Sequence, residues 1–387
     1  MFNTTKAENF TMKKQAVLVA LIAGLALAGC GGGGGSNSST SVTTGGSVAA
    51  NGGTSTGSGT NSDAGAASNV PSNIIVASTT VIDPVTSVPD AQYASTLEEA
   101  AIFKALNDMR GAMGVGLLQQ SLKLDIAAGN HDFFFVKNEL YKNSTYIDTT
   151  VNGISGPHYE DPALFGFTGQ APADRAIYGQ YAGTVAENVT VNTPAGECAK
   201  NLFNSVYHLI SLVNWYREVG ISVTPGKTCV IVLGHDAANE MKPQLPKAGS
   251  VSVTPSAGQT GVETTFFNQM EMPKPAADIG VGTGVGRPVL VNLYSQGAET
   301  LAPTEVGVIS YTMTRVSDGA AVDARILTAP GVLSMGANLT ADEHINGSGN
   351  IVLLPTSPLD AATTYKVTFV GSVKQSPVGK TWMFTTK

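Results

Sequence analysis

The sequence is poor in the residues that build thiolate metal clusters, disulfide networks and nucleic-acid sites. Its 387 residues include three cysteines, five histidines and 22 lysines or arginines, and the formal net charge is -7. Proteins that bind nucleic acid neutralise phosphates with clustered cations, and the chain has no such cluster of lysine and arginine. We therefore expect no nucleic-acid partner.

Cysteine is the scarcest of these residues. Cys30 ends an apolar N-terminal run, whereas Cys198 and Cys229 lie fairly close together much further along the chain. Two thiols alone do not make a metal site, but in an exported protein two nearby cysteines commonly pair. We expect a single disulfide between Cys198 and Cys229.

The N-terminus indicates export. Lys13 and Lys14 precede an apolar run over residues 16–28, which closes with the sequence LAGC. A cationic start, an apolar segment too short to span a bilayer and a small-residue end are typical of a bacterial signal peptide. The ending resembles a lipoprotein box, which implies cleavage before Cys30 and acylation of Cys30, for example with palmitate. The alternative is a plain secretory signal in which Cys30 is incidental.

These features predict a signal peptide over residues 1–29 and a membrane partner reached through lipidated Cys30. Stable anchoring needs at least two acyl chains. Gly31 stands where an Asp would favour the inner membrane, so we expect a lipoprotein of the bacterial outer membrane, facing the periplasm or the cell surface.

Residues 30–70 predict a flexible tether. Almost every position is Gly, Ser, Thr, Asn or Ala, and Asp63 carries the one charge. Such a segment cannot bury a core, and as a coil of about 40 residues it would span roughly 35 Å. The remaining length suits two domains, which we place at residues 90–240 and 250–387.

The first of these domains begins with helical periodicity. Thr96 and Glu99 have the spacing of a capping box, and Gly111 and Gly114 predict the end of the helix. A second helix follows over residues 121–138, with Ser121 as a possible cap. Its apolar face is formed by Leu124, Ala127, His131 and Phe134. We therefore expect His131 to be a core histidine with one backbone partner.

The rest of this domain mixes helix and strand. We expect a third helix over residues 195–207 and two short strands, EVGISV at 218–223 and TCVIVLG at 228–234. Helices interleaved with a few strands predict a layered domain of the α/β or α+β class.

The second domain reads as all-β. Short alternating runs are separated by Gly, Pro and Asp, and in TYKVTFV the side chains of Tyr365, Val367 and Phe369 share one face. A β-sandwich follows from this pattern. The glycine string GVGTGVGRP runs into Pro288 and a strand, so we interpret it as a loop and not as a phosphate site. His344 has no evident partner.

Five segments of the first domain occur in the order of a known superfamily. They are LNDMRGAMGVGLLQQSLKLDIAAGNHDF, GPHYED, ADRAIYGQY, AENV and SVYHLISLV with the following EVGI. Together, over about residues 96–236, they resemble the bacterial CAP superfamily of cysteine-rich secretory, antigen 5 and pathogenesis-related 1 proteins, also called SCP domains. The end of the chain resembles bacterial Ig-like domains. The fold implied is α+β, with a CAP-type α-β-α sandwich followed by an all-β Ig-like sandwich.

The resemblance implies a central cavity. It places His158, Glu187 and His208 together, with Ser205 and Tyr207 at the wall. Two imidazoles and a carboxylate form either a divalent-metal set, with His158 and His208 as Zn²⁺ or Mg²⁺ ligands, or a hydrogen-bonded acid and base network. In the alternative interpretation, His208 braces the end of its own helix and backbone amides satisfy Glu187.

Two positions depart from the family pattern. Leu209 stands where the bacterial proteins have Arg, and the second cavity glutamate of the animal and plant proteins has no counterpart, since Ser205 and Val206 fall near its place. Asp174 and Arg175 are interpreted as structural, with the forked donors of Arg175 tying a loop.

Three functions follow as hypotheses. The first is a lipid-anchored surface protein that binds a small apolar, sterol-like or peptide ligand, with the Ig-like domain as spacer or adhesion module. The second is a peptidase-like hydrolase, with Glu187 or a histidine as base and Ser205 or a water as nucleophile. The third is a structural envelope protein that meets another envelope component.

Overall fold

The computed structural model describes residues 82–236, 238 and 240–387. The predicted signal peptide, Cys30 and the tether lie outside these residues. The described residues form one compact unit of mixed α and β structure, with few helices and many strands in several sheets. In the described part of the chain no helix is both long and apolar enough to cross a membrane.

The N-terminal half of the described chain carries the helices. They are α1 (Glu98–Met113), α2 (Leu122–Lys137), α3 (Ser144–Ile147), α4 (Pro172–Tyr178), α5 (Cys198–Phe203) and α6 (Tyr207–Leu212). Its strands are β1 (Gln119–Gln120), β2 (Thr150–Val151), β3 (Ile154–Ser155), β4 (Gly183–Val191), β5 (Glu218–Thr224) and β6 (Thr228–Asp236). Short 3-10 turns are η1 (Leu140–Lys142) and η2 (Gly156–His158).

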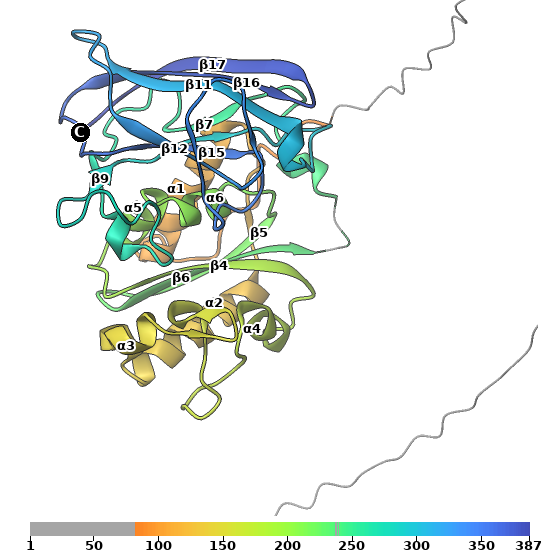
Figure 1. Ribbon diagram of the computed structural model, residues 1–387. Coiled ribbons are helices and arrows are strands. Elements are labelled where there is room, and N and C mark those ends of the chain that lie inside the picture. The colour runs from red at the N-terminus through yellow and green to blue at the C-terminus, as the bar shows by residue number, and fades with distance from the viewer. Residues whose placement is uncertain (1–81, 237, 239) are drawn as a thin grey trace, which may run out of the picture. The chain divides into compact units, whose positions relative to one another are not determined.

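One four-stranded sheet organises this half. Its order is β1-β5-β6-β4, parallel between β1 and β5 and antiparallel elsewhere. Helices α2 and α4 cover one face, and α1, α5 and α6 lie on the other (Figure 1). The sheet is therefore buried on both faces, and β4 lies at its edge.

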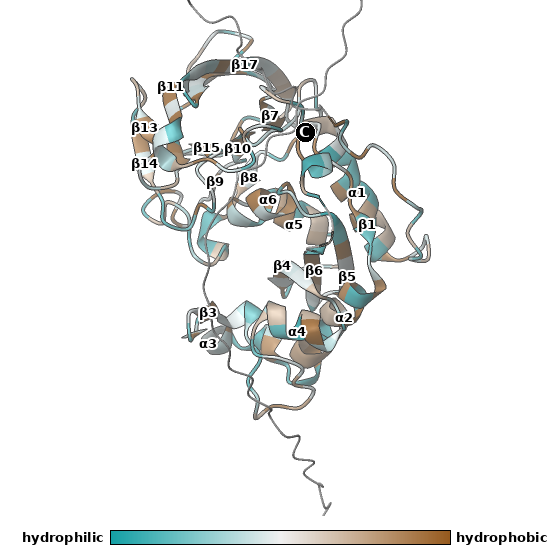
Figure 2. Ribbon diagram, turned by 90° about the vertical axis from the view of Figure 1, so that its right-hand side faces the viewer, coloured by the Kyte–Doolittle hydropathy of each residue, from teal (hydrophilic) through white to brown (hydrophobic). Residues whose placement is uncertain are grey.

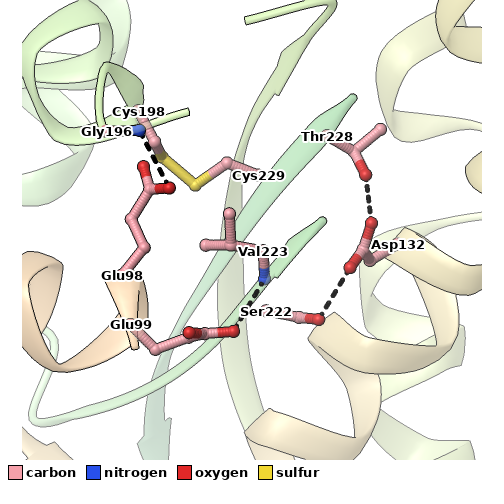
Figure 3. Close-up of a disulfide and its surroundings, with 9 residues drawn as sticks. All are labelled: Glu98, Glu99, Asp132, Gly196, Cys198, Ser222, Val223, Thr228 and Cys229. Carbon is pink, nitrogen blue, oxygen red and sulfur yellow. Dashed lines mark hydrogen bonds between the residues drawn. A yellow bond between two sulfur atoms is a disulfide. The ribbon is translucent and has the colours of Figure 1, made fainter. Parts of the chain in front are cut away.

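Helix α1 differs from its prediction at the start and confirms the predicted end at Gly114. It begins at Glu98 with Leu97 as N-cap and has no side-chain cap, so the predicted capping box is wrong. The Glu99 carboxylate instead accepts a hydrogen bond from the Val223 N–H of β5 at 3.1 Å, shown in Figure 3. The helix passes Gly111 and ends at Gly114, whose φ of 74° is the left-handed conformation that glycine adopts without strain.

Helix α2 confirms the predicted buried face. Leu124, Ala127, His131 and Phe134 are at most 1% exposed. His131, however, has two partners and not one. Its Nδ1 lies 3.0 Å from Glu160 Oε1, and its Nε2 lies 2.8 Å from the Pro157 carbonyl oxygen. Each ring nitrogen of His131 therefore lies against an acceptor oxygen.

The predicted third helix, residues 195–207, is shorter in the structure, and a further helix starts at its predicted end. α5 ends at Phe203 and α6 begins at Tyr207, so the chain leaves helical geometry between them. The predicted disulfide is confirmed. Cys198 at the start of α5 is bonded to Cys229 of β6, and both residues are 1% exposed (Figure 3). The bond fixes α5 to the centre of the sheet.

The C-terminal region is all-β apart from single 3-10 turns. Its strands are β7 (Ser252–Thr254), β8 (Thr265–Phe266), β9 (Val285–Gly286), β10 (Val289–Asn292), β11 (Val306–Arg315), β12 (Ala324–Thr328), β13 (Leu333–Ser334), β14 (Leu339–Ala341), β15 (Asn350–Pro355), β16 (Thr364–Val373) and β17 (Ser376–Thr385). The turns are η3 (Lys242–Gln244), η4 (Asn268–Met270) and η5 (Pro303–Glu305).

Two sheets enclose the core of this region. Their orders are β14-β12-β15-β10-β7 and β13-β11-β16-β17. Tyr365, Val367 and Phe369 of β16 point into the core and are at most 2% exposed, which confirms the alternation predicted for this strand. The glycine string forms a loop only over residues 280–284, because Val285–Gly286 are strand β9, and the predicted strand after Pro288 is β10.

A second apolar core joins the two regions. Met113, Val206, Leu209, Ile210 and Val213 pack against buried side chains of the C-terminal region. Those partners are Phe266, Val285, Leu290, Leu327, Ala329, Ile345, Val352 and Leu354. Figure 2 shows α5 and α6 between the four-stranded sheet and the C-terminal strands. Leu209 is 1% exposed in this core, so an apolar residue at this position packs against the second region.

Candidate functional site

A pocket of about 930 Å³ lies where the two regions meet. One wall comes from α3 and η2, one from the end of β4 and the residues after it, and one from α5, the start of α6 and the segment 263–274 of the C-terminal region. Apolar groups include Tyr141, Ile147, Val189, Val191, Phe266, Phe267, Met270 and Met272. His158, Ser205 and His208 also line it. Pockets of this size and mixed lining suit ligands.

His158 belongs to a carboxylate-imidazole pair. Its Nδ1 lies 3.0 Å from Glu187 Oε1, and among the described residues its Nε2 has no hydrogen-bond partner. The carboxylate accepts the Nδ1 proton, so Nε2 carries the lone pair of the neutral ring. Burial lowers the pKa of His158, although Glu187 opposes this effect, and the neutral ring is therefore the favoured form.

Glu187 is held as a carboxylate by its neighbours. Its side chain is 1% exposed, and Arg175 Nη2 donates to both oxygens at 2.7 and 2.9 Å. Burial alone would raise the pKa of Glu187, but Arg175, His131 and His158 outweigh burial, so the pKa lies well below its usual range. Thus Glu187 is ionised and fixes the orientation of His158.

Arg175 also performs the predicted structural task. Its Nη1 donates to the carbonyl oxygens of Gly169 and Gln170 at 3.2 and 3.3 Å, which ties the loop before α4. Its Nη2 donates to the His158 carbonyl as well. Arg175 is therefore both a loop tie and the counter-ion of Glu187. The Asp174 carboxylate accepts from the Ala171 N–H at 3.0 Å at the start of α4.

A further carboxylate, Glu160, completes this buried network. It accepts the Thr168 N–H at 2.7 Å and approaches His131 Nδ1 at 3.0 Å, and its side chain is fully buried. His131 Nε2 lies 3.6 Å from Glu187 Oε1. Sequence reasoning missed Glu160 and the part of His131 in this network. The one available signal was that Glu160 follows His158 by two residues.

His208 lies on another wall of the pocket and has its own carboxylate. Its Nδ1 is 3.0 Å from Oε1 of Glu271, a residue of the C-terminal region whose side chain is 1% exposed. Glu271 also accepts the backbone N–H groups of Val206, Tyr207 and His208 at 2.9, 2.8 and 3.2 Å. A carboxylate from the second region therefore caps the first turn of α6. This cap explains why a new helix begins at Tyr207.

The contacts of Ser205 do not form a nucleophile relay. Its Oγ donates to the Leu202 carbonyl at 2.9 Å and lies 3.1 Å from His208 Nδ1. Glu271 approaches the same ring nitrogen. In a Ser-His-acid triad the hydroxyl and the carboxylate use opposite nitrogens of the ring. The arrangement at His208 therefore differs from that of a serine hydrolase.

Tyr207 lies away from the pocket. Its hydroxyl donates to Asp342 Oδ2 at 2.8 Å in the C-terminal region. Its ring meets His344 edge to face, with centroids 5.9 Å apart. Tyr207 thus connects the two regions and does not line the space beside His158 and His208.

The predicted metal site has little geometric support. Within the described residues, no group of three or more His, Cys, Asp or Glu side chains is arranged to hold a metal ion. His158 and His208 each use Nδ1 on a carboxylate, so each ring has Nε2 as its remaining nitrogen for a metal. Two such nitrogens are fewer than the three protein ligands of a catalytic zinc site. These residues do not fit a divalent metal without a further ligand.

No protein-family model matches the chain. No curated protein matches it at a significant level.

Proposed function

We propose that the protein is an exported, lipid-anchored envelope protein that binds a ligand in the pocket between its two regions. The pocket of about 930 Å³, with two carboxylate-held imidazoles among apolar side chains, carries this proposal. A small apolar, sterol-like or peptide ligand suits such a lining, because apolar walls supply affinity and a few fixed polar groups supply orientation.

The finer fold assignment belongs to the same proposal. Helices on both faces of one sheet, with His158, Glu187 and His208 near one pocket, support a CAP-type domain over residues 90–240. The two facing sheets support an Ig-like domain over residues 250–387. In this proposal the second domain is more than a spacer, because residues 263–274 form a wall of the pocket and Glu271 orients His208.

Filling the pocket tests the proposal. Ser144 and Thr145 are adjacent, exposed residues of α3, but only Ser144 lines the pocket. We expect Ser144→Trp to abolish the binding of the apolar fluorophore 1-anilinonaphthalene-8-sulfonate and the co-purification of small molecules detected by mass spectrometry. Thr145→Trp should retain both. Equal behaviour of the two variants would contradict ligand binding at this pocket.

A hydrolase is the second candidate, and the His158–Glu187 pair favours it. An imidazole held by a carboxylate through Nδ1 can accept a proton from a water at Nε2. Peptidase and esterase assays with His158→Gln and His344→Gln test this role. Loss of a measurable turnover only in His158→Gln would support it, and absence of turnover on every substrate would count against it.

A further inference from the structure

The four-stranded sheet has an unpaired margin at the pocket. Among the described residues, β4 pairs with β6 and with no other strand. Residues 189–193 line the pocket. Figure 2 shows β4 at the margin of the sheet, with α5 on one side and α4 on the other. An edge strand of this kind presents backbone groups that another strand can pair with.

The register identifies these backbone groups. The last paired residues of β4 and β6 are Val191 and Thr228, so Asn192 lies opposite Lys227. The Asn192 N–H donates to the Lys227 carbonyl at 2.6 Å, and Asn192 and Lys227 are therefore a hydrogen-bonded pair. In an antiparallel ladder, hydrogen-bonded and non-hydrogen-bonded residues alternate. Thr190 is therefore bonded to β6, whereas Val189 and Val191 direct their N–H and C=O groups away from it.

These outward groups have no partner in the described chain. Beyond the strand ladder, the backbone of neither Val189 nor Val191 enters a hydrogen bond with a described residue. Val189 is 6% exposed, so its polar backbone lies in a largely covered position. The Thr190 hydroxyl, also at the pocket, is buried without a partner. Buried polar groups of this kind are usually satisfied by a hydrogen-bonding partner.

We propose that the ligand of this pocket is an extended peptide, which pairs with β4 as an added strand. The inference rests on the proposed function and names its ligand class. A peptide backbone presents N–H and C=O groups at every second residue on one edge, which matches the period of Val189 and Val191. A purely apolar ligand would leave these donors and acceptors unpaired.

Charge at the pocket favours a peptide that carries negative charge. Four lysines line it, namely Lys142, Lys200, Lys274 and Lys387. The lining contains three carboxylates, Asp148, Glu263 and Glu271. Glu271 already contacts His208 and accepts hydrogen bonds from the start of α6. Lys142, Lys200 and Lys387 already pair with Glu139, Glu197 and Glu263. Among the described residues Lys274 has no carboxylate partner, so Lys274 is the cation that would stabilise an acidic side chain or a C-terminal carboxylate of the peptide.

Proline at an outward position tests the pairing. The Val191 N–H faces away from β6, so Val191→Pro removes a donor for the peptide and keeps the ladder, as edge strands tolerate. Val191→Thr is the matched control because it retains the N–H. Dodecapeptides selected from a random phage-displayed library on the wild-type mature chain serve as probes. We expect Val191→Pro to weaken binding of the enriched peptide by roughly tenfold and Val191→Thr to change it little.

Two readouts on the wild-type protein do not depend on how the variant folds. The enriched peptide should slow amide hydrogen exchange in residues 186–193. Every second amide of the paired peptide faces β4. N-methylation of that set of amides should abolish binding, and N-methylation of the other set should leave binding unchanged.

The outcomes separate this inference from the proposed function. Strand pairing would be overturned if no peptide is enriched. It would also be overturned if N-methylation of either alternate set of amides leaves binding of the enriched peptide unchanged. If the apolar fluorophore still distinguishes Ser144→Trp from Thr145→Trp, ligand binding stands and only the peptide inference falls. If neither a peptide nor the fluorophore binds, the proposed function falls as well.

Discussion

At the scale of single residues, Glu271 has the most consequential position. It is buried, it bonds three backbone N–H groups at the start of α6 and it holds His208. Charge-assisted hydrogen bonds of this kind contribute more than neutral ones. A carboxylate at position 271 is therefore needed both to cap the start of α6 and to hold the imidazole of His208 in its orientation.

We expect Glu271→Gln to lower the free energy of unfolding by about 2–3 kcal/mol, since it removes a buried carboxylate that accepts three backbone N–H groups of α6 and contacts His208. Urea unfolding measures this change. Glu263→Gln is the matched control in the same segment. Its carboxylate is 22% exposed and pairs with Lys200 and Lys387, so its loss should cost less than about 1 kcal/mol. Equal losses in the two variants would contradict the role of Glu271.

The pKa of Glu187 predicts an acid-sensitive fold. Arg175 and two histidines outweigh the effect of burial, so the folded pKa lies below the ordinary 4.5. A depressed carboxyl pKa stabilises the folded state above about pH 4.5, and this stability is lost as pH falls toward the folded pKa. The lowered pKa of His158 has the same sign and adds a loss of stability that begins below pH 6.5.

Glu187→Gln should therefore reduce stability at pH 7 by about 3 kcal/mol, because it breaks a buried ion pair. It should also flatten the decline of stability below pH 4.5. Urea unfolding between pH 3 and pH 7 checks both effects. A variant whose stability falls with acid as steeply as that of the wild type would show that other groups control the acid response.

At the scale of elements, the short helices depend on contacts outside themselves. α5 and α6 have six residues each, which is far too short for stability in isolation. The disulfide holds α5 to β6, and Glu271 together with the shared apolar core holds α6. Neither helix would form from its own sequence alone.

The disulfide therefore has a measurable effect on this part of the fold. Its cysteines are 31 residues apart, and a loop of that size corresponds to about 3–4 kcal/mol in the chain-entropy model. We expect the double variant Cys198→Ala with Cys229→Ala to lose about 3 kcal/mol in urea unfolding. The wild type measured with a reductant should behave like the variant. Two free thiols in protein taken from the cell envelope would refute the bond.

At the scale of the whole molecule, the two regions act as one body. The described residues form a compact unit, and an apolar core of both regions lies between α6 and the strands β10, β12 and β15. Since the pocket draws its walls from both regions, neither region provides the site alone.

The predicted lipid anchor can be tested on the complete protein. Cys30→Ser removes the site of acylation, so we expect the variant to leave the detergent phase in Triton partitioning. Its melting temperature should equal that of the wild type, because the described fold begins far from Cys30. Persistence of the variant in the detergent phase would contradict a lipoprotein anchor.

The sequence by itself determined what depends on local periodicity and composition. The buried faces with Leu124 and His131, and with Tyr365 and Phe369, follow from the 3.6-residue and two-residue repeats of helix and strand. The cysteine pair followed from scarcity and an export signal, which left one partner for each thiol. The mixed class of the first region and the all-β second region followed from the same patterns.

Only the tertiary structure decided which distant groups meet. Glu271 is 63 residues from His208, and no local repeat links a carboxylate in one region to a helix end in another. The break before Tyr207, the burial of Leu209 and the turn of Tyr207 toward Asp342 all depend on that packing. The free edge of β4 likewise depends on strand order, because hydrophobic alternation specifies the face of a strand but not its neighbours.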